Sequence, residues 1–167
     1  DAQVGILIDY LKANDLYDNS VIIVSSDHGE AFYQHGYPTH STSLYDAQIR
    51  VSTLFKQPGQ TTSTVREDPI SLIDINPTIL EMLGMANHPN FQGKPILEKP
   101  REDPIFILSH GIIKAIGVVD YPWKYFGSAR EAPQLFNLAT DPQESTDLTG
   151  TRSEEHTSEL QSPDHLV

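Results

Sequence analysis

The sequence is notable first for what it lacks. None of its 167 residues is a cysteine, so disulfide bonds and a cysteine nucleophile are excluded within this chain, and the redox compartment stays open. No apolar run approaches the roughly 20 residues that a membrane-spanning helix requires. Positive charge is scarce, with 11 Lys and Arg against 23 Asp and Glu. Without a basic stripe to neutralise phosphates, the sequence argues against nucleic acid or an anionic membrane surface as a partner.

The most informative segment present is an apolar run, residues 21–24, that ends in small and polar residues. All four of its residues are Val or Ile and none carries a charge, a pattern that predicts a strand buried on both faces of a parallel sheet. Asp27 and His28 follow directly, where ligands bind in open α/β sheets, and they offer an oxygen and a nitrogen to a divalent metal. We expect Gly29 to allow a sharp turn there. The alternative is an Asp-His-Gly turn that merely ends a strand.

Periodicity predicts the remaining elements. We expect a helix over residues 2–13, strands over 21–25 and 50–55, a polar loop over 26–41, and helical turns over 42–48, 71–75 and 77–83. Helix, strand, functional loop and strand is the doubly wound α/β pattern. Four prolines mark residues 85–104 as a linker. Short antiparallel strands are expected beyond it, over 105–108, 112–119, 123–126 and 134–138.

The two ends of the chain do not look native. The first residue is Asp1, already inside the expected helix, so we expect the protein to start upstream. Residues 152–161 match the translation of the sequencing-adapter oligonucleotide agatcggaagagcacacgtctgaactccag, and residues 164–167 match its continuation gatcatctcgta. We therefore interpret residues 152–167 as a translated adapter and exclude them from the fold. The alternative is a native, polar, disordered tail.

Residues 26–30 read Ser-Asp-His-Gly-Glu, and this run resembles an element of the sulfatases, within the alkaline phosphatase superfamily. Further runs resemble other motifs of that family in the same order, at residues 18–20, 35–36, 43–51, 73–84, 91–93, 123–125 and 134–144. The resemblance implies the C-terminal part of a doubly wound, alkaline-phosphatase-like α/β sheet over residues 1–84. It also implies the linker over 85–104 and a small C-terminal antiparallel β subdomain over 105–151.

For chemistry, the resemblance implies that Asp27 and His28 are metal ligands and that the other ligands lie in a missing N-terminal half of the same domain. Ca²⁺ is the first expectation, with Mn²⁺ or Zn²⁺ as alternatives. His40, or in its place His35, is the imidazole expected to contact the sulfate or protonate the leaving oxygen. Glu30 is interpreted as facing solvent or capping the loop. The formylglycine nucleophile and its "C/S-x-P-S-R" motif are absent from this sequence and are expected upstream.

The expected function is therefore hydrolysis of a sulfate ester, on a small molecule or a carbohydrate, by a longer parent enzyme. Without the nucleophile the chain alone is expected to be inactive. The family implies a periplasmic or secreted, extracytoplasmic location. Two alternatives stay open: a phosphodiesterase or phosphoethanolamine/phosphoglycerol transferase on the same fold, and a non-catalytic binding protein that lost the nucleophile.

Overall fold

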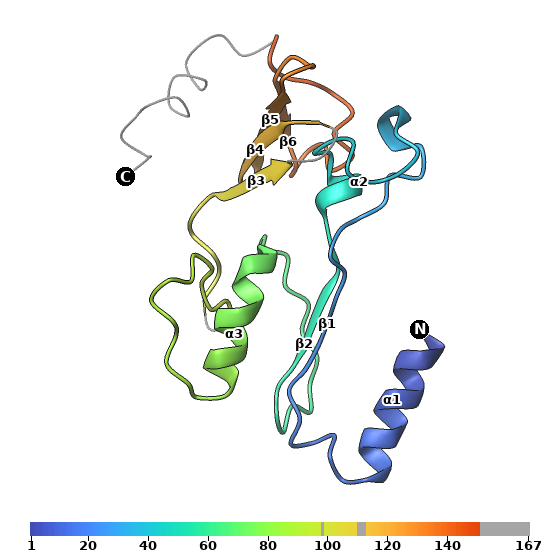
Figure 1. The fold of residues 1–167 in the computed structure, drawn as a ribbon, viewed down its shortest axis with the longest axis vertical. Helices are drawn as coiled ribbons and strands as arrows, with labels where there is room; N and C mark the ends of the chain where they lie inside the picture. Colours follow the sequence, from blue (N-terminus) through green and yellow to red (C-terminus); the bar gives the residue numbers. More distant parts are fainter. Residues whose placement is uncertain (98, 110–112, 151–167) are drawn as a thin grey trace. The chain divides into compact units, whose positions relative to one another are not determined.

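The computed structural model describes residues 1–97, 99–109 and 113–150, which divide into two compact units (Figure 1). The first unit holds residues 1–27 and 51–102, and the second begins with residues 28–50 and resumes at residue 103. Each unit is described by itself. The expected adapter-derived tail, residues 152–167, lies outside the described residues. In the described part, no helix combines the length and the apolar character needed to cross a bilayer.

The first unit begins with α1 (Ala2–Ala13), followed by the strand pair β1 (Ile22–Ser25) and β2 (Thr53–Lys56). These three elements lie close to the ranges predicted from periodicity. The turn between α1 and β1 is tied to β2 by the buried Lys56 side chain, whose ammonium donates to the carbonyl oxygens of Asp18 at 3.2 Å and Ser20 at 3.0 Å. A Lys side chain buried in this way has its donors satisfied by backbone carbonyls.

The pairing of β1 differs from the expectation of a parallel strand buried on both faces. β1 and β2 lie side by side and are antiparallel, with Ile22 opposite Lys56 and Ser25 opposite Thr53 (Figure 1). Val24 is 42% exposed. A parallel pair needs a crossover helix that covers the sheet, whereas the helical turns between these strands, η1 (Gln34–Gly36) and α2 (Asp46–Ile49), belong to the second unit. An antiparallel pair carries no such requirement.

The first unit ends in η2 (Leu72–Asp74), α3 (Ile75–Met82) and the proline-rich segment expected as a linker. Asp74 is fully buried and holds that segment, since its carboxylate accepts from the Lys94 backbone N–H at 2.9 Å and from the Arg101 guanidinium at 2.5 Å. At Gly93 any Cβ would collide with the Ile73 carbonyl, so only glycine permits this approach. The expected linker thus contacts η2 at residues 93, 94 and 101.

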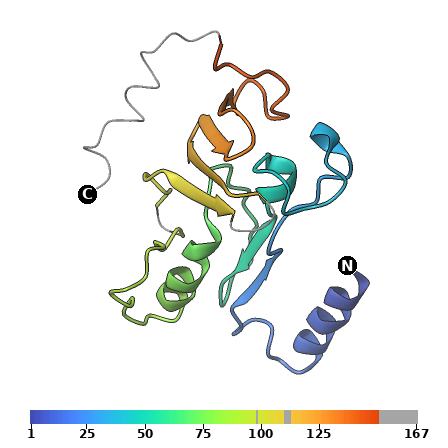
Figure 2. The same ribbon diagram turned by 45° about the horizontal axis from the view of Figure 1, so that its top comes forward.

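The second unit contains a four-stranded antiparallel sheet in the order β3 (Ile105–Ser109), β4 (Ala115–Asp120), β5 (Trp123–Ser128), β6 (Gln134–Asn137) (Figures 1 and 2). The four predicted strands are confirmed within one to three residues at the described positions, and residue 112, the predicted start of the second, lies outside them. The core of this unit combines the sheet with the segment before α2; its buried members are Leu44, Tyr45, Ala115, Phe126 and Phe136.

Candidate active site

The loop that follows β1 carries the predicted metal ligands. β1 ends at Ser25, and both Asp27 and His28 are exposed immediately beyond it. His28 Nδ1 lies 2.7 Å from the carbonyl oxygen of Gly29. Because a carbonyl can only accept, Nδ1 carries the proton in this contact and the lone pair of the neutral ring lies on Nε2. Nε2 is therefore the nitrogen through which the predicted ligand His28 would bind a metal.

Gly29 has a different role from the sharp turn predicted for it. Its φ lies outside the left-handed region, so its conformation alone does not require glycine. A Cβ at this position would press on the Ala47 carbonyl oxygen and lie 3.0 Å from the Arg50 carbonyl oxygen. The Gly29 N–H also donates to the Gln48 carbonyl at 2.8 Å. Glycine is needed here for the close approach of two backbone segments.

His40 is the predicted catalytic imidazole that the structure places beside His28. The two rings stack with centroids 4.0 Å apart and planes 27° apart. His40 Nδ1 lies 2.9 Å from Glu30 Oε2, and both side chains are partly exposed. Three side chains of the expected loop, His28, Glu30 and His40, are thus gathered in one cluster.

His35, the competing candidate, has different surroundings. It lies in η1 with φ of 53°, and its ring stacks on Tyr45 at 3.7 Å with nearly parallel planes. Tyr45 belongs to the core and donates through its hydroxyl to Gln134 at 2.9 Å. The geometry therefore attaches His35 to the core of the unit, while His40 shares a cluster with His28.

Gln48 ties the two ends of the loop together, a role that sequence reasoning missed. The residue is 3% exposed, and its side-chain oxygen accepts from the backbone N–H groups of Thr42 at 2.9 Å and Ser43 at 3.1 Å. Its own carbonyl accepts from Gly29. The only signal in the sequence was an uncharged polar residue inside the otherwise matched run 43–51. These contacts hold the backbone next to His28 and close to His40 in place.

A buried ion cluster joins three of the recognised motifs, and the sequence did not reveal this contact. Lys124 on β5 has no exposed side-chain surface, and its ammonium lies 2.7 Å from Asp46 and 2.6 Å from Glu144. Glu144 also accepts from the Asp46 backbone N–H at 2.5 Å. Burial raises the pKa of Glu144, and the Lys124 charge acts in the opposite direction. Two carboxylates and one ammonium thereby fasten α2 to the sheet.

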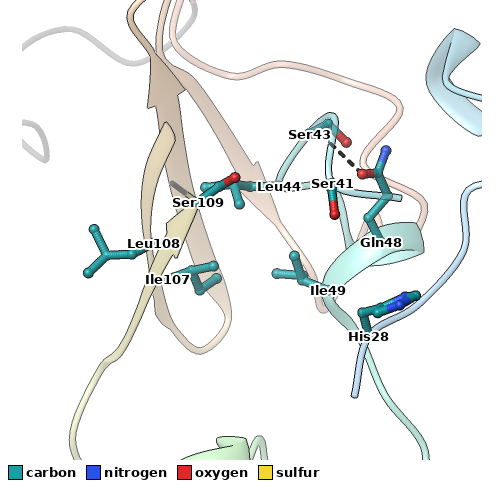
Figure 3. Close-up of a pocket in the computed structure, with 9 residues that line it drawn as sticks. All are labelled: His28, Ser41, Ser43, Leu44, Gln48, Ile49, Ile107, Leu108 and Ser109. Carbon is teal, nitrogen blue, oxygen red and sulfur yellow. Dashed lines mark hydrogen bonds between the residues drawn. The ribbon is translucent and has the colours of Figure 1, made fainter. Parts of the chain in front are cut away.

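A cavity of about 320 Å³ opens within the second unit between the α2 region and β3 (Figure 3). His28, Gln48 and Ile49 line one side, and Ile107, Leu108 and Ser109 line the β3 side. Its walls combine aliphatic side chains with hydroxyl and amide groups. A cavity of this size and lining can hold a small organic group.

The chemistry of the donors fits part of a divalent metal site. Asp27 would supply carboxylate oxygens and His28 would supply Nε2, ligands that Ca²⁺, Mn²⁺ and Zn²⁺ accept to different degrees. Over the described ranges, no set of three or more His, Cys, Asp or Glu side chains is arranged to hold a metal. These two residues can therefore provide only part of a coordination shell.

Comparison with known proteins gives the family. The Sulfatase family model matches residues 1–85. Arylsulfatase K of Mus musculus is 33% identical over 167 residues, which cover 89% of this chain and 30% of the relative. Choline-sulfatase of Rhizobium meliloti is 26% identical, and the match covers 89% of this chain and 30% of that relative. A solved structure described as a 2-O GAG sulfatase has a TM-score of 0.76 at 20% identity, with 95% of this chain and 37% of that chain covered.

The chain belongs to the sulfatase family, because the family model matches more than half of its residues. The structural likeness confirms the predicted α/β fold. The chain spans about 30% of the length of the curated relatives it matches. The resemblance predicted from the motifs, including its restriction to the C-terminal part of the relatives, is confirmed.

Proposed function

We propose that this chain is part of a metal-dependent hydrolase that cleaves sulfate esters. The observation that carries the proposal is the cluster beyond β1. There the neutral ring of the predicted ligand His28 has its lone pair on Nε2, and the ring stacks on His40 with centroids 4.0 Å apart. Family membership and the similarity to sulfatases support the reaction class. The assignment of Asp27 and His28 as metal ligands follows from their place after a strand and from the family motif.

Each residue has a distinct part in this reaction. Asp27 and His28 would hold the divalent metal, with Ca²⁺ as the first candidate and Mn²⁺ or Zn²⁺ as alternatives. When bound, that ion supplies positive charge that stabilises the ester's non-bridging oxygens. His40 would contact the sulfate or donate a proton to the leaving oxygen, while His35 is the second candidate for this role. The formylglycine nucleophile and the remaining ligands would come from parts of the domain outside this sequence.

The substrate class is proposed from the chemistry and from the relatives. A choline-sulfatase and a 2-O GAG sulfatase are among the similar proteins, so both small-molecule and carbohydrate sulfate esters are candidates. The walls of the cavity beside His28 suit a partly apolar leaving group. An extracytoplasmic location is part of the same proposal. The 167-residue chain alone is expected to release no sulfate from an aryl sulfate, because its sequence lacks the nucleophile motif.

The metal assignment is tested with Asp27→Ala in a full-length protein that contains this segment. Loss of one ligand should lower metal affinity and aryl-sulfate turnover by about 10- to 100-fold, with partial recovery when metal is added in excess. Asp9→Ala is the matched control, because Asp9 is an exposed carboxylate on α1. Unchanged metal content and turnover in Asp27→Ala would refute the assignment. Turnover of a phosphate diester, with no turnover of a sulfate ester, would favour the phosphodiesterase alternative. If neither ester is turned over, the non-catalytic alternative is favoured.

A further inference from the structure

The loop places one carboxylate, Glu30, directly on the imidazole of His40. Glu30 Oε2 and His40 Nδ1 are 2.9 Å apart, within the range of a strong hydrogen bond to a charged acceptor. We propose that Glu30 is a positioning residue that fixes the ring orientation and the tautomer of His40. This proposal rests on the role proposed above for His40, and it replaces the interpretation of Glu30 as a solvent-facing residue.

The direction of this hydrogen bond follows from the chemistry of the two groups. An ionised carboxylate only accepts, so His40 must donate from Nδ1. In the neutral ring the lone pair then lies on Nε2, on the side away from Glu30. Any proton that His40 takes up or gives away during a reaction therefore passes through Nε2. The stacked ring of His28 covers one face of the imidazole and limits its rotation.

The backbone holds Glu30 in place from both sides. Gly29 before it is pinned by its hydrogen bond to the Gln48 carbonyl. Ala31 after it is 1% exposed, and its carbonyl accepts from the Gln34 N–H at 2.8 Å. A carboxylate between two anchored residues can orient a partner with little additional entropy cost.

The second oxygen of Glu30 argues against a purely stabilising role. Oε1 is buried and has no hydrogen-bond partner among the described residues. An unsatisfied buried carboxylate oxygen costs free energy. The side chain also binds another side chain, whereas a loop cap would accept from backbone N–H groups. Glu30 is thus placed at a cost to stability where it controls His40.

The tautomer can be measured by long-range ¹H–¹⁵N NMR of the histidine rings in the 167-residue chain, at a pH where the rings are neutral. Wild-type His40 should show the proton on Nδ1. Glu30→Ala should move it largely to Nε2, the tautomer that free histidine prefers, whereas Glu30→Gln keeps an acceptor oxygen and should retain Nδ1–H. The matched control is Glu131→Gln, which alters a carboxylate that binds Tyr37 in the same loop. It should leave His40 unchanged.

Kinetics in a full-length protein carrying this segment separate the two proposals. Glu30→Ala should lower kcat about 10- to 100-fold with little change in KM, and Glu30→Gln should recover part of the loss. A His40 tautomer unaffected by Glu30→Ala would overturn the positioning role. If the tautomer shifts as expected but His40→Ala leaves kcat intact, the role proposed for His40 fails, and the Glu30 contact is structural only.

Discussion

Two regions of the second unit treat charge in opposite ways. On β5, the Lys124 side chain is fully buried and its ammonium is paired with two carboxylates on separate segments. In the loop after β1, His28 and His40 stack on each other while each keeps some contact with solvent. The first arrangement excludes ligands and fastens elements together. The second leaves both imidazole rings partly exposed to solvent on a backbone held by Gln48, as a binding or catalytic site requires.

The backbones of the two regions differ in the same sense. The sheet strands pair in regular register, whereas four residues of the loop other than glycine have positive φ: Phe32, Tyr33, His35 and Ser41. Phe32 and Tyr33 are also highly exposed. Such conformations are costly and cluster at functional sites. The polar side chains of the matched motifs therefore divide into those that pair with each other inside the unit, such as Lys124, and those of the loop that we propose face a ligand.

Removal of the buried ammonium should have the largest effect. Lys124→Met would leave the Asp46 and Glu144 carboxylates without their counter-ion and should lower the free energy of unfolding by about 3–5 kcal/mol. Urea unfolding followed by fluorescence of Trp123, the single tryptophan, would measure the loss. Lys114→Met is the control, because Lys114 is exposed just before β4. Equal midpoints for the two variants would contradict a structural role for the cluster.

The pH dependence of the same variant sharpens this test. Burial already raises the pKa of Glu144, and Lys124 opposes that effect. Without the ammonium, the folded-state pKa should rise further above the unfolded value. A carboxyl of this kind stabilises the fold when protonated and loses that contribution as pH rises through its folded pKa. The difference in the free energy of unfolding between the wild type and Lys124→Met should therefore become smaller as pH falls. Urea titrations of both proteins at several pH values measure this.

A smaller effect is expected in the loop from Gly29→Ala. The new methyl group would push against the Ala47 and Arg50 carbonyls, and displacement of this backbone should cost about 1–3 kcal/mol. It should also separate the stacked rings, visible as changed histidine ring shifts. Gly5→Ala in α1 is the matched control: its Cβ would meet open space, and better helix propensity should stabilise α1 slightly. Unperturbed ring shifts in Gly29→Ala would disprove the anchoring role.

Local patterns in the sequence predicted the elements well, because apolar periodicity and turn residues act over short range. The strands at 22–25 and 53–56 and the four-stranded sheet follow from such patterns. The antiparallel pairing of β1 did not follow, since a short apolar run fits either orientation. The Lys124–Asp46 contact spans 78 positions, and no local pattern specifies such a distant partner. Asp27, His28 and His40 were predicted because the family motif marks them, and their roles stay predictions, whereas Gln48 acts through contacts to the backbone that no sequence pattern specifies.

The smallest expected effect concerns Tyr37, where the loop meets the sheet region through Glu131. Burial, then the hydrogen bond to Glu131 and its negative charge, raises the pKa of Tyr37 to about 12.

Glu131→Gln removes the charge but keeps an acceptor, so the pKa of Tyr37 should fall while staying above 10, since burial persists. In the wild type, the raised pKa means that ionisation of Tyr37 lowers the free energy of unfolding between pH 10 and 12. In the variant, this loss should be smaller and should end at a lower pH. Titration of ¹³Cζ-labelled tyrosines measures this, with Tyr45 as an internal comparison, because burial and Glu144 precede Glu131 among the causes that raise its pKa and its pKa should fall less. A Tyr37 pKa unmoved by the substitution would show that burial alone sets it, and that the loop is tied to the sheet less tightly than the contact at 2.9 Å indicates.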